Sequence, residues 1–237
     1  MTATTRRAWS TGLLAVLLLA IPRAVARAQD ATYAANLTEL DSATQSALGK
    51  ELARARERGL PIEPLVAKVR EGRLKRAAGP RIRAAVERLG ERLTAARDAL
   101  GAGSSPEELI AGADALAVGA QVPSLRAVRA ATTQSVTAPI GALAQLLASG
   151  VAEPKAVEMV ILLLKRNASP ALLVALGNQV ESDVATGLSP TASAAFRLRA
   201  LEGQLSGNDL TTATVPGVTN ALGGQNNGSS GPTRRKP

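Results

Sequence analysis

Prolines recur at a nearly constant interval through the second half of this chain. Six of them are separated by 17, 16, 15, 16 and 20 residues, at Pro106, Pro123, Pro139, Pro154, Pro170 and Pro190. Several follow a residue type that caps helices, as in Ser105-Pro106 and Ser169-Pro170. Proline is favoured at the first helical position, where the amide hydrogen that it lacks would be unpaired anyway. Each of these prolines therefore predicts the start of a helix.

Glycines near the far ends of the same segments agree with this interpretation. Gly119, Gly150 and Gly187 fit helix C-caps, where the backbone φ angle turns positive. We therefore expect six helices of about 11 to 16 residues between positions 105 and 206. Two successive helices occupy 31 to 36 residues, which is the size of a helical-hairpin repeat.

The composition favours an all-α fold. Aromatic residues make up only 1% of the chain, so its apolar positions are Leu, Val, Ile and Ala, and alternating strand patterns are scarce. We expect an array of short, proline-started antiparallel helices. It could be an α-solenoid that exposes a concave surface or a compact bundle closed around one core. A globule of irregularly packed short helices is the third alternative.

Upstream, the pattern predicts further helices. The first covers 38–58, with Asn36 as its cap, Glu39 at capping-box spacing and Gly59 at its end. Pro61 opens the second, whose apolar residues are Ile62, Leu65, Val66, Val69 and Leu74.

The third upstream helix is the most clearly amphipathic one. It is expected to start at Pro80 and to end at Leu100, before Gly101. Its apolar residues advance by threes and fours along one face, at Ile82, Val86, Leu89, Leu93 and Ala96. Further along, the run Val157–Leu164 is apolar nearly all round but far too short to span a bilayer, which predicts a central buried helix.

Charge is unevenly divided along the chain. Residues 50–97 hold 14 Lys and Arg against 6 Asp and Glu, whereas residues 98–233 hold 7 against 10. Within one all-helical domain, 37–207, we therefore distinguish a basic part, 50–97, from a helical-hairpin part, 105–206.

Five cations cluster around the Gly79-Pro80 turn, where two helix ends can converge, and only Glu71 lies nearby to offset them. They are Arg73, Lys75, Arg76, Arg81 and Arg83. Such a patch predicts binding to anionic lipid or lipopolysaccharide surfaces through the wider region 68–92. The alternative is a solvated helix face with i,i+4 ion pairs. Sequence-specific recognition of nucleic acid is not expected, because aromatic stacking platforms are missing.

The first 28 residues have the features of a secretory signal peptide. A positive n-region contains Arg6-Arg7, and Leu13–Ile21 is an apolar stretch too short to span a bilayer. An A-x-A motif ends at Ala28, so we expect cleavage before Gln29 and a short lead to residue 36. The mature chain would be periplasmic or secreted, exported by the general secretory or the twin-arginine route. It would be neither a lipoprotein, since the chain has no cysteine, nor an integral membrane protein.

Residues 208–237 are rich in Gly, Asn and Ser and offer too little apolar surface to offset the entropy cost of folding. We expect a disordered tail there, ending in the small cationic cluster Arg234-Arg235-Lys236.

Most residues that identify catalytic and metal sites are missing. The chain has no His and no Cys, which removes the usual ligands of zinc, haem and iron–sulfur sites and excludes Ser/His/Asp and Cys/His mechanisms. No Ser-x-x-Lys spacing and no glycine-rich phosphate loop occurs. Glu107 and Glu108, directly after Pro106, are expected to act as first-turn partners of the helix dipole. We therefore expect no catalytic residue, no metal and no cofactor.

These observations favour a non-enzymatic helical adaptor or scaffold of the bacterial envelope, whose partner is another envelope protein. Two alternatives stay open. One is a peripheral binder of anionic membrane or lipopolysaccharide surfaces through residues 68–92. The other is an enzyme of unrecognised chemistry.

Overall fold

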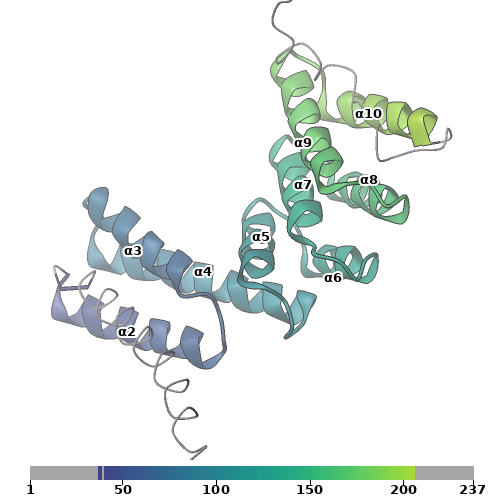
Figure 1. Ribbon diagram of the computed structural model, residues 1–237. Helices are drawn as coiled ribbons and strands as arrows, with labels where there is room; N and C mark the ends of the chain where they lie inside the picture. Colours follow the sequence, from purple (N-terminus) through teal and green to yellow (C-terminus); the bar gives the residue numbers. More distant parts are fainter. Residues whose placement is uncertain (1–36, 39, 206–237) are drawn as a thin grey trace, which may run out of the picture. The chain divides into compact units, whose positions relative to one another are not determined.

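The computed structural model describes residues 37, 38 and 40–205, with side chains up to residue 201. Within this part of the chain all regular structure is α-helical, without a strand, which confirms the predicted all-α fold (Figure 1). The chain divides into two compact units, one ending at Ala95 and the other beginning at Ala96. We call residues 40–95 the basic unit and residues 96–205 the helical array.

The basic unit begins with helix α2, Ser42–Glu57. Its N-cap is Asp41, whose carboxylate accepts a hydrogen bond from the Thr44 amide at 2.9 Å. The predicted start at residue 38 was therefore wrong. Asp41, directly before the first helical residue, satisfies a free amide of the first turn. The expected cap, Asn36, lies outside the described residues.

Helix α3 spans Glu63–Leu74, and helix α4 spans Gly79–Leu100. Pro61 precedes α3 and does not open it; the proline of its first turn is Pro64. The predicted apolar face of α4 is confirmed, since Ile82, Val86, Leu89, Leu93 and Ala96 are all buried.

Helices α3 and α4 approach each other closely at Gly72. A Cβ atom added at Gly72 would lie 2.7 Å from Cγ1 of Ile82, which is closer than real Cβ contacts. Glycine is therefore the residue that allows the end of α3 to rest on the first turns of α4. Further buried side chains fill the unit, namely Leu48, Leu52, Leu65, Val66 and Val69.

The helical array contains the six predicted helices. They are α5 (Pro106–Ala117), α6 (Val122–Ala130), α7 (Thr137–Ala148), α8 (Glu153–Lys165), α9 (Pro170–Ala185) and α10 (Pro190–Leu205). Helix α6, with 9 residues, is shorter than the expected 11 to 16. Each of the six regularly spaced prolines falls within the first three residues of its helix. Gly119, Gly150 and Gly187 follow α5, α7 and α9 with positive φ angles, as predicted.

The helices of the array form two rows (Figure 1). Helix α7 packs between α5 and α9 in one row, and α8 packs on α6 and α10 in the other. Helix α7 also packs on α8, and α9 on α10, so that the rows are joined by hairpins. A helix that contacts the helix two places further along is the neighbour pattern of an α-solenoid and not of a closed bundle.

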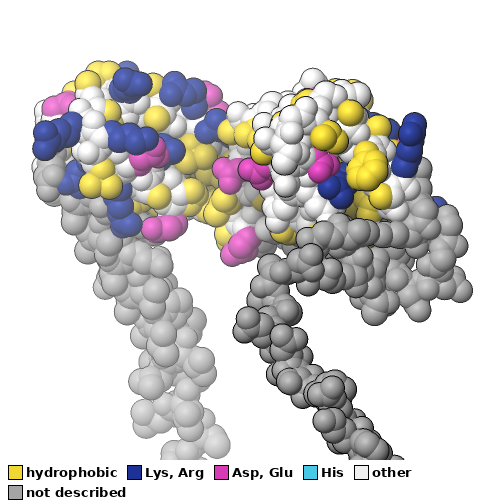
Figure 2. Space-filling view, turned by 90° about the horizontal axis from the view of Figure 1, so that it is seen from above, with side chains coloured by type: hydrophobic (Ala, Val, Ile, Leu, Met, Phe, Trp, Pro, Cys, Tyr) yellow, Lys and Arg dark blue, Asp and Glu magenta, His cyan; other side chains and the backbone are white. Residues whose placement is uncertain are grey.

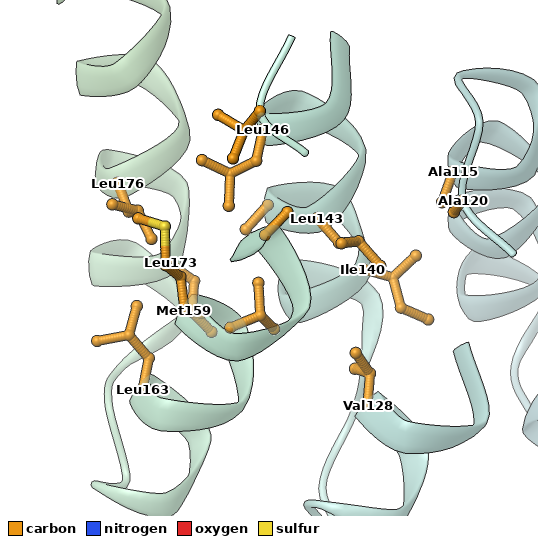
Figure 3. Close-up of a cluster of buried hydrophobic side chains, with 14 of the residues drawn as sticks. Ala115, Ala120, Val128, Ile140, Leu143, Leu146, Met159, Leu163, Leu173 and Leu176 are labelled. Atoms are coloured by element: carbon orange, nitrogen blue, oxygen red, sulfur yellow. The ribbon is translucent and has the colours of Figure 1, made fainter. Parts of the chain in front are cut away.

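Aliphatic side chains between the rows form the core of the array. Figure 3 shows Leu143 and Leu146 of α7, Met159 and Leu163 of α8, and Leu173 and Leu176 of α9 gathered in a shared interior; each is at most 2% exposed. Phe196 does not join them, because its side chain is 59% exposed. The predicted central helix at 157–164 is buried on one face only, and Ile161 and Leu162 are partly exposed. This core therefore consists of close-packed aliphatic residues.

Carboxylates from neighbouring helices cap two helix starts in the array. The N-cap residues of α6 and α7 are Gln121 and Val136, and neither caps its helix with its own side chain. The Gln121 amide donates to Glu153 Oε1 of α8 at 2.6 Å. The Val136 amide donates to Glu108 Oε1 of α5 at 2.9 Å. Each of these glutamates thereby satisfies a free amide on a neighbouring helix of its own row.

Glu108 has a second role at the start of its own helix. Its carboxylate accepts from the Ser105 amide at 3.0 Å, and the Glu108 amide donates to Ser105 Oγ, which completes a capping box. Arg129 Nη1 of α6 lies 3.5 Å from Glu108 Oε1. Burial opposes ionisation of this carboxyl, but the Val136 and Ser105 amides and Arg129 together hold its pKa below the ordinary value. The expected first-turn role of Glu108 is thus only part of its structural function.

Candidate functional site

The clearest candidate site is a cavity of about 580 Å³ between the end of α3 and the start of α4. We call it the basic pocket. Its lining carries four cations and one carboxylate: Lys68, Lys75, Arg76 and Arg81 with Glu71. Gly72, Ala77, Ala78, Ile82 and Ala85 provide its small and apolar lining. The pocket therefore combines a net positive charge with apolar surface.

The turn between α3 and α4 brings these cations together. Lys75 and Arg76 follow the last residue of α3, whereas Arg81 lies in the first turn of α4. Because the chain reverses over only a few residues, cations from two helix ends line the same cavity. Lys and Arg side chains also gather over the outer surface of α2 to α4, the left-hand part of the molecule in Figure 2.

Three of the five cations predicted around this turn, Lys75, Arg76 and Arg81, line the pocket. The other two do not. Arg73 is half-buried on α3, and Arg83 Nε lies 3.5 Å from Glu87 Oε1 on α4.

Lys68 was missed as an individual residue, although it lies inside the predicted region 68–92. The sequence could have predicted that Lys68 lies on the same helix face as Lys75. Residues 68, 71, 72 and 75 have the i, i+3, i+4, i+7 spacing of one helix face, and all of them line the pocket.

Glu71 holds the two lysines of the pocket. Lys68 Nζ donates to Glu71 Oε2 at 2.6 Å, and Lys75 Nζ donates to Glu71 Oε1 at 2.6 Å. The hydrogen bonds from Lys68 and Lys75, with their positive charges, lower the pKa of Glu71 to about 2. The carboxylate is therefore ionised at any physiological pH and partly neutralises both lysines. Within the described residues, no ion pair engages Arg76 or Arg81.

Arg76 has an unusual backbone conformation for its residue type. Its φ angle is 51°, in the left-handed region where a Cβ atom crowds the backbone. Asn167, with a φ of 54°, is the other non-glycine residue with a positive φ in the described part of the chain. Placing a residue other than Gly, Asn or Asp in this region costs on the order of 1 kcal/mol of conformational free energy. The end of α3 is therefore less stable than it would be with glycine at position 76.

A second cavity, of about 530 Å³, lies in the helical array at the starts of α7 and α9. We call it the array groove; it is lined by Ser135, Thr137, Ala138, Gly141, Ala142, Gln145, Pro170 and Val174. Gln145 crosses from α7 to α9 and donates to Asn178 and Glu181, both at 2.8 Å. Gly141 faces open space, and Val174 is 47% exposed. This groove carries no charged side chain and offers small apolar contacts.

No group of three or more acidic side chains that could hold a metal ion occurs among the described residues. Nor does that part of the chain contain a helix long and apolar enough to cross a membrane. The predicted cleavage site between Ala28 and Gln29 lies outside the described residues.

Comparisons with known protein families, with curated proteins and with solved structures found no match for this chain.

Proposed function

We propose that this protein acts by binding and not by catalysis, and that it attaches to anionic surfaces through the basic pocket. The observation that carries this proposal is the convergence of four cations, from α3, from the turn after it and from the first turn of α4, on one cavity. Each lysine or arginine near an anionic membrane contributes about 1 kcal/mol, within a Debye length of the surface. Several cations in one patch therefore give measurable and salt-sensitive binding.

The competing interpretation is a solvated helix face, and the ion pairs of the basic unit support it in part. Arg83 pairs with Glu87, and Arg54 Nη1 lies 2.6 Å from Glu51 Oε2. Pairs of this kind use up positive charge within one helix. Arg76 and Arg81 form no such pair among the described residues, and these two face the cavity. Their free charge favours the binding proposal.

The test is a comparison of two variants with equal net charge. In the pocket variant, the three turn cations that line the pocket, Lys75, Arg76 and Arg81, are replaced by Gln together with the adjacent Arg73 and Arg83. In the control, the same replacement is made outside the pocket, at Lys50, Arg54, Arg56, Arg58 and Arg88. Binding to vesicles containing phosphatidylglycerol is measured at low salt.

We expect the pocket variant to lose more than about a hundredfold in affinity and the control to lose much less. Equal losses would show that only net charge matters. Absence of measurable binding of the wild-type protein to such vesicles would contradict the proposal.

A second function, a protein adaptor or scaffold, is favoured by the array groove. Two-row helical arrays present extended surfaces to partner proteins, and this groove offers uncharged, small-residue contacts beside the exposed Val174. We propose an envelope protein as the partner. The Gly141→Leu variant places a larger side chain in the groove at a position where an added Cβ meets nothing within 4 Å. A partner captured by the wild type and lost by this variant supports the adaptor role; capture by both proteins contradicts use of the groove.

We further propose that the protein is exported and that its mature form starts at Gln29. The supporting feature is the short apolar segment with an A-x-A motif that ends at Ala28. N-terminal sequencing of protein recovered from the producing bacterium tests this. An intact Met1 terminus on that protein would contradict it.

A further inference from the structure

Helices in both units end with the same pair of hydrogen bonds. The residue with a positive φ donates its amide to the carbonyl three residues back, and the following residue donates to the carbonyl five residues back. After α3, for example, the Arg76 amide donates to Arg73 O at 2.8 Å, and the Ala77 amide donates to Gly72 O at 2.9 Å. This is the Schellman motif, which glycine normally completes. The residues at its left-handed position are Gly59, Arg76, Gly119, Gly150, Asn167 and Gly187.

Arg76 stands out in this series. Four of the six positions are glycine, and asparagine is the residue that tolerates the left-handed region best after glycine. Arginine has neither advantage. The helix end alone would be more stable with glycine at position 76, so the fold does not explain the choice of residue. Strain that the fold does not require points to a functional constraint.

The surroundings of Arg76 show what the side chain can do. It lines the basic pocket together with Arg81 from the first turn of α4. Lys68 and Lys75 are held by Glu71, each at 2.6 Å. The three side chains of Lys68, Glu71 and Lys75 keep one net positive charge, but both ammonium groups are bound to the carboxylate. The two guanidinium groups are therefore the cations of the pocket that no ion pair holds among the described residues. A guanidinium is a planar fork that binds phosphate oxygens in pairs, and it stays charged at any physiological pH.

We propose that Arg76 and Arg81 form a binding site for a phosphate monoester group. This inference rests on the proposed binding of anionic surfaces and names the chemical group that is recognised. A monoester carries about two negative charges at neutral pH and a diester only one, so the monoester is attracted more strongly to the two guanidinium groups and to the net positive charge of the pocket. The cavity of about 580 Å³ is larger than a phosphate group, and Ala77, Ala78 and Ala85 offer apolar contacts for the atoms that carry it. A monoester headgroup of a lipid and a soluble phosphate ester share this chemistry.

The experiment compares Arg76→Gly with two controls. Asn167→Gly makes the same kind of change at a left-handed position outside the basic pocket. Arg88→Gln removes one exposed charge from α4 that does not line the pocket. The full-length proteins are tested against phosphatidylcholine vesicles that contain phosphatidic acid, a monoester, or phosphatidylglycerol, a diester, at matched surface charge. Thermal unfolding of each protein is recorded without vesicles.

We expect Arg76→Gly to unfold at a higher temperature than the wild type and to bind phosphatidic acid on the order of tenfold more weakly. Asn167→Gly should also unfold at a higher temperature but bind as the wild type does. Arg88→Gln should weaken binding to both vesicles slightly and equally. If Arg76 had only a structural role, Arg76→Gly would not raise the unfolding temperature and weaken phosphatidic acid binding at the same time.

Two outcomes separate this inference from the proposal on which it rests. If the wild type binds both vesicles equally well, and Arg76→Gly weakens binding no more than Arg88→Gln, surface binding stands and the phosphate site is overturned. If the wild type binds neither vesicle, both fall.

Inorganic phosphate identifies the source of the ligand. Displacement of the protein from phosphatidic acid vesicles by inorganic phosphate, but not by chloride at equal ionic strength, assigns the site to the phosphate group itself. Monoester-selective binding that inorganic phosphate does not displace assigns the site to a lipid-borne monoester.

Discussion

The basic unit and the helical array are both built from short helices, but they use their charged side chains differently. In the basic unit, ion pairs such as Arg54–Glu51, Lys68–Glu71 and Arg83–Glu87 each stay within one helix. In the array, carboxylates join different helices. Glu108 of α5 reaches α6 and α7, and Asp183 of α9 accepts from Arg197 of α10 at 2.6 and 2.9 Å. Charge in the array holds helices together, whereas much of the charge in the basic unit stays available on the surface.

This difference explains why an excess of cations can be tolerated in one region. Residues 50–97 hold 14 basic against 6 acidic residues, and local pairs cannot neutralise that excess. Exposed pairs of this type contribute little to stability, so the basic unit depends on its buried aliphatic residues. Its charged surface can then serve binding without supporting the fold.

The largest expected effect separates the two cores. Leu143 of α7 is fully buried in the array, and Leu65 of α3 is fully buried in the basic unit. Leu143→Ala should lower the stability of the array by about 2–5 kcal/mol, because it leaves a cavity among aliphatic neighbours. Leu65→Ala should do the same to the basic unit. Hydrogen exchange resolved by segment measures both.

Vesicle binding is compared at a temperature where most wild-type molecules are folded. We expect Leu65→Ala to weaken binding there and Leu143→Ala to leave it unchanged. If Leu143→Ala reduced binding as strongly as Leu65→Ala, the assignment of binding to the basic unit would be wrong.

The next effect tests the carboxylate that joins helices in the array. Glu108→Ala should cost on the order of 2–3 kcal/mol, because the buried Val136 amide and the half-buried Ser105 amide lose their acceptor and Arg129 loses its partner. Glu108→Gln, which keeps an acceptor oxygen, should cost less. Chemical denaturation at neutral pH measures both changes.

Acid titration of stability gives an independent check on Glu108. Its pKa in the folded state is below the ordinary value of 4.5, so the ionised carboxylate contributes its full stability above that value. This contribution is lost as the pH falls through the lower, folded-state pKa. The wild type should therefore lose more stability in that acid range than Glu108→Gln does. Identical acid profiles would show that Glu108 does not act through its charge.

The smallest effects compare one carboxylate from each unit. Asp183→Asn should cost about 1–2 kcal/mol, because Asp183 is only 15% exposed and accepts from Arg197 and Ser193 of another helix. Glu87→Gln should change stability by less than about 0.5 kcal/mol, because its pair with Arg83 is half exposed and stays within α4. Equal costs in urea denaturation would remove the contrast between the units.

Helix positions were predictable because their signals are local. A proline marks a first turn and a glycine marks a left-handed end wherever the neighbours lie, so α5 to α10 follow from the spacing alone. The start of α2 was misplaced because two polar residues, Asn36 and Asp41, could each cap a helix there. Residue type alone does not decide which of these two residues caps the helix, because the apolar residues of α2 are compatible with either start.

The helix that Glu108 contacts could not be predicted, because its partner amide belongs to Val136, which is 28 residues away. The capping-box spacing from Ser105 to Glu108 was visible in the sequence, but the second bond depends on α5 and α7 being neighbours in one row. The left-handed backbone of Arg76 could not be predicted either. In a sequence, glycine is the residue that indicates a left-handed helix end, and α3 has arginine at that position.

The most direct test of the central claim is a hydrogen-exchange footprint of the full-length protein with and without phosphatidic acid vesicles. If the basic pocket is the binding surface, amides between residues 68 and 85 should exchange more slowly with vesicles present, and those of α7 to α9 should not change. Loss of this protection in Arg76→Gly would tie it to the guanidinium group. Protection confined to the helical array, or spread evenly over both units, would contradict the division of function between them.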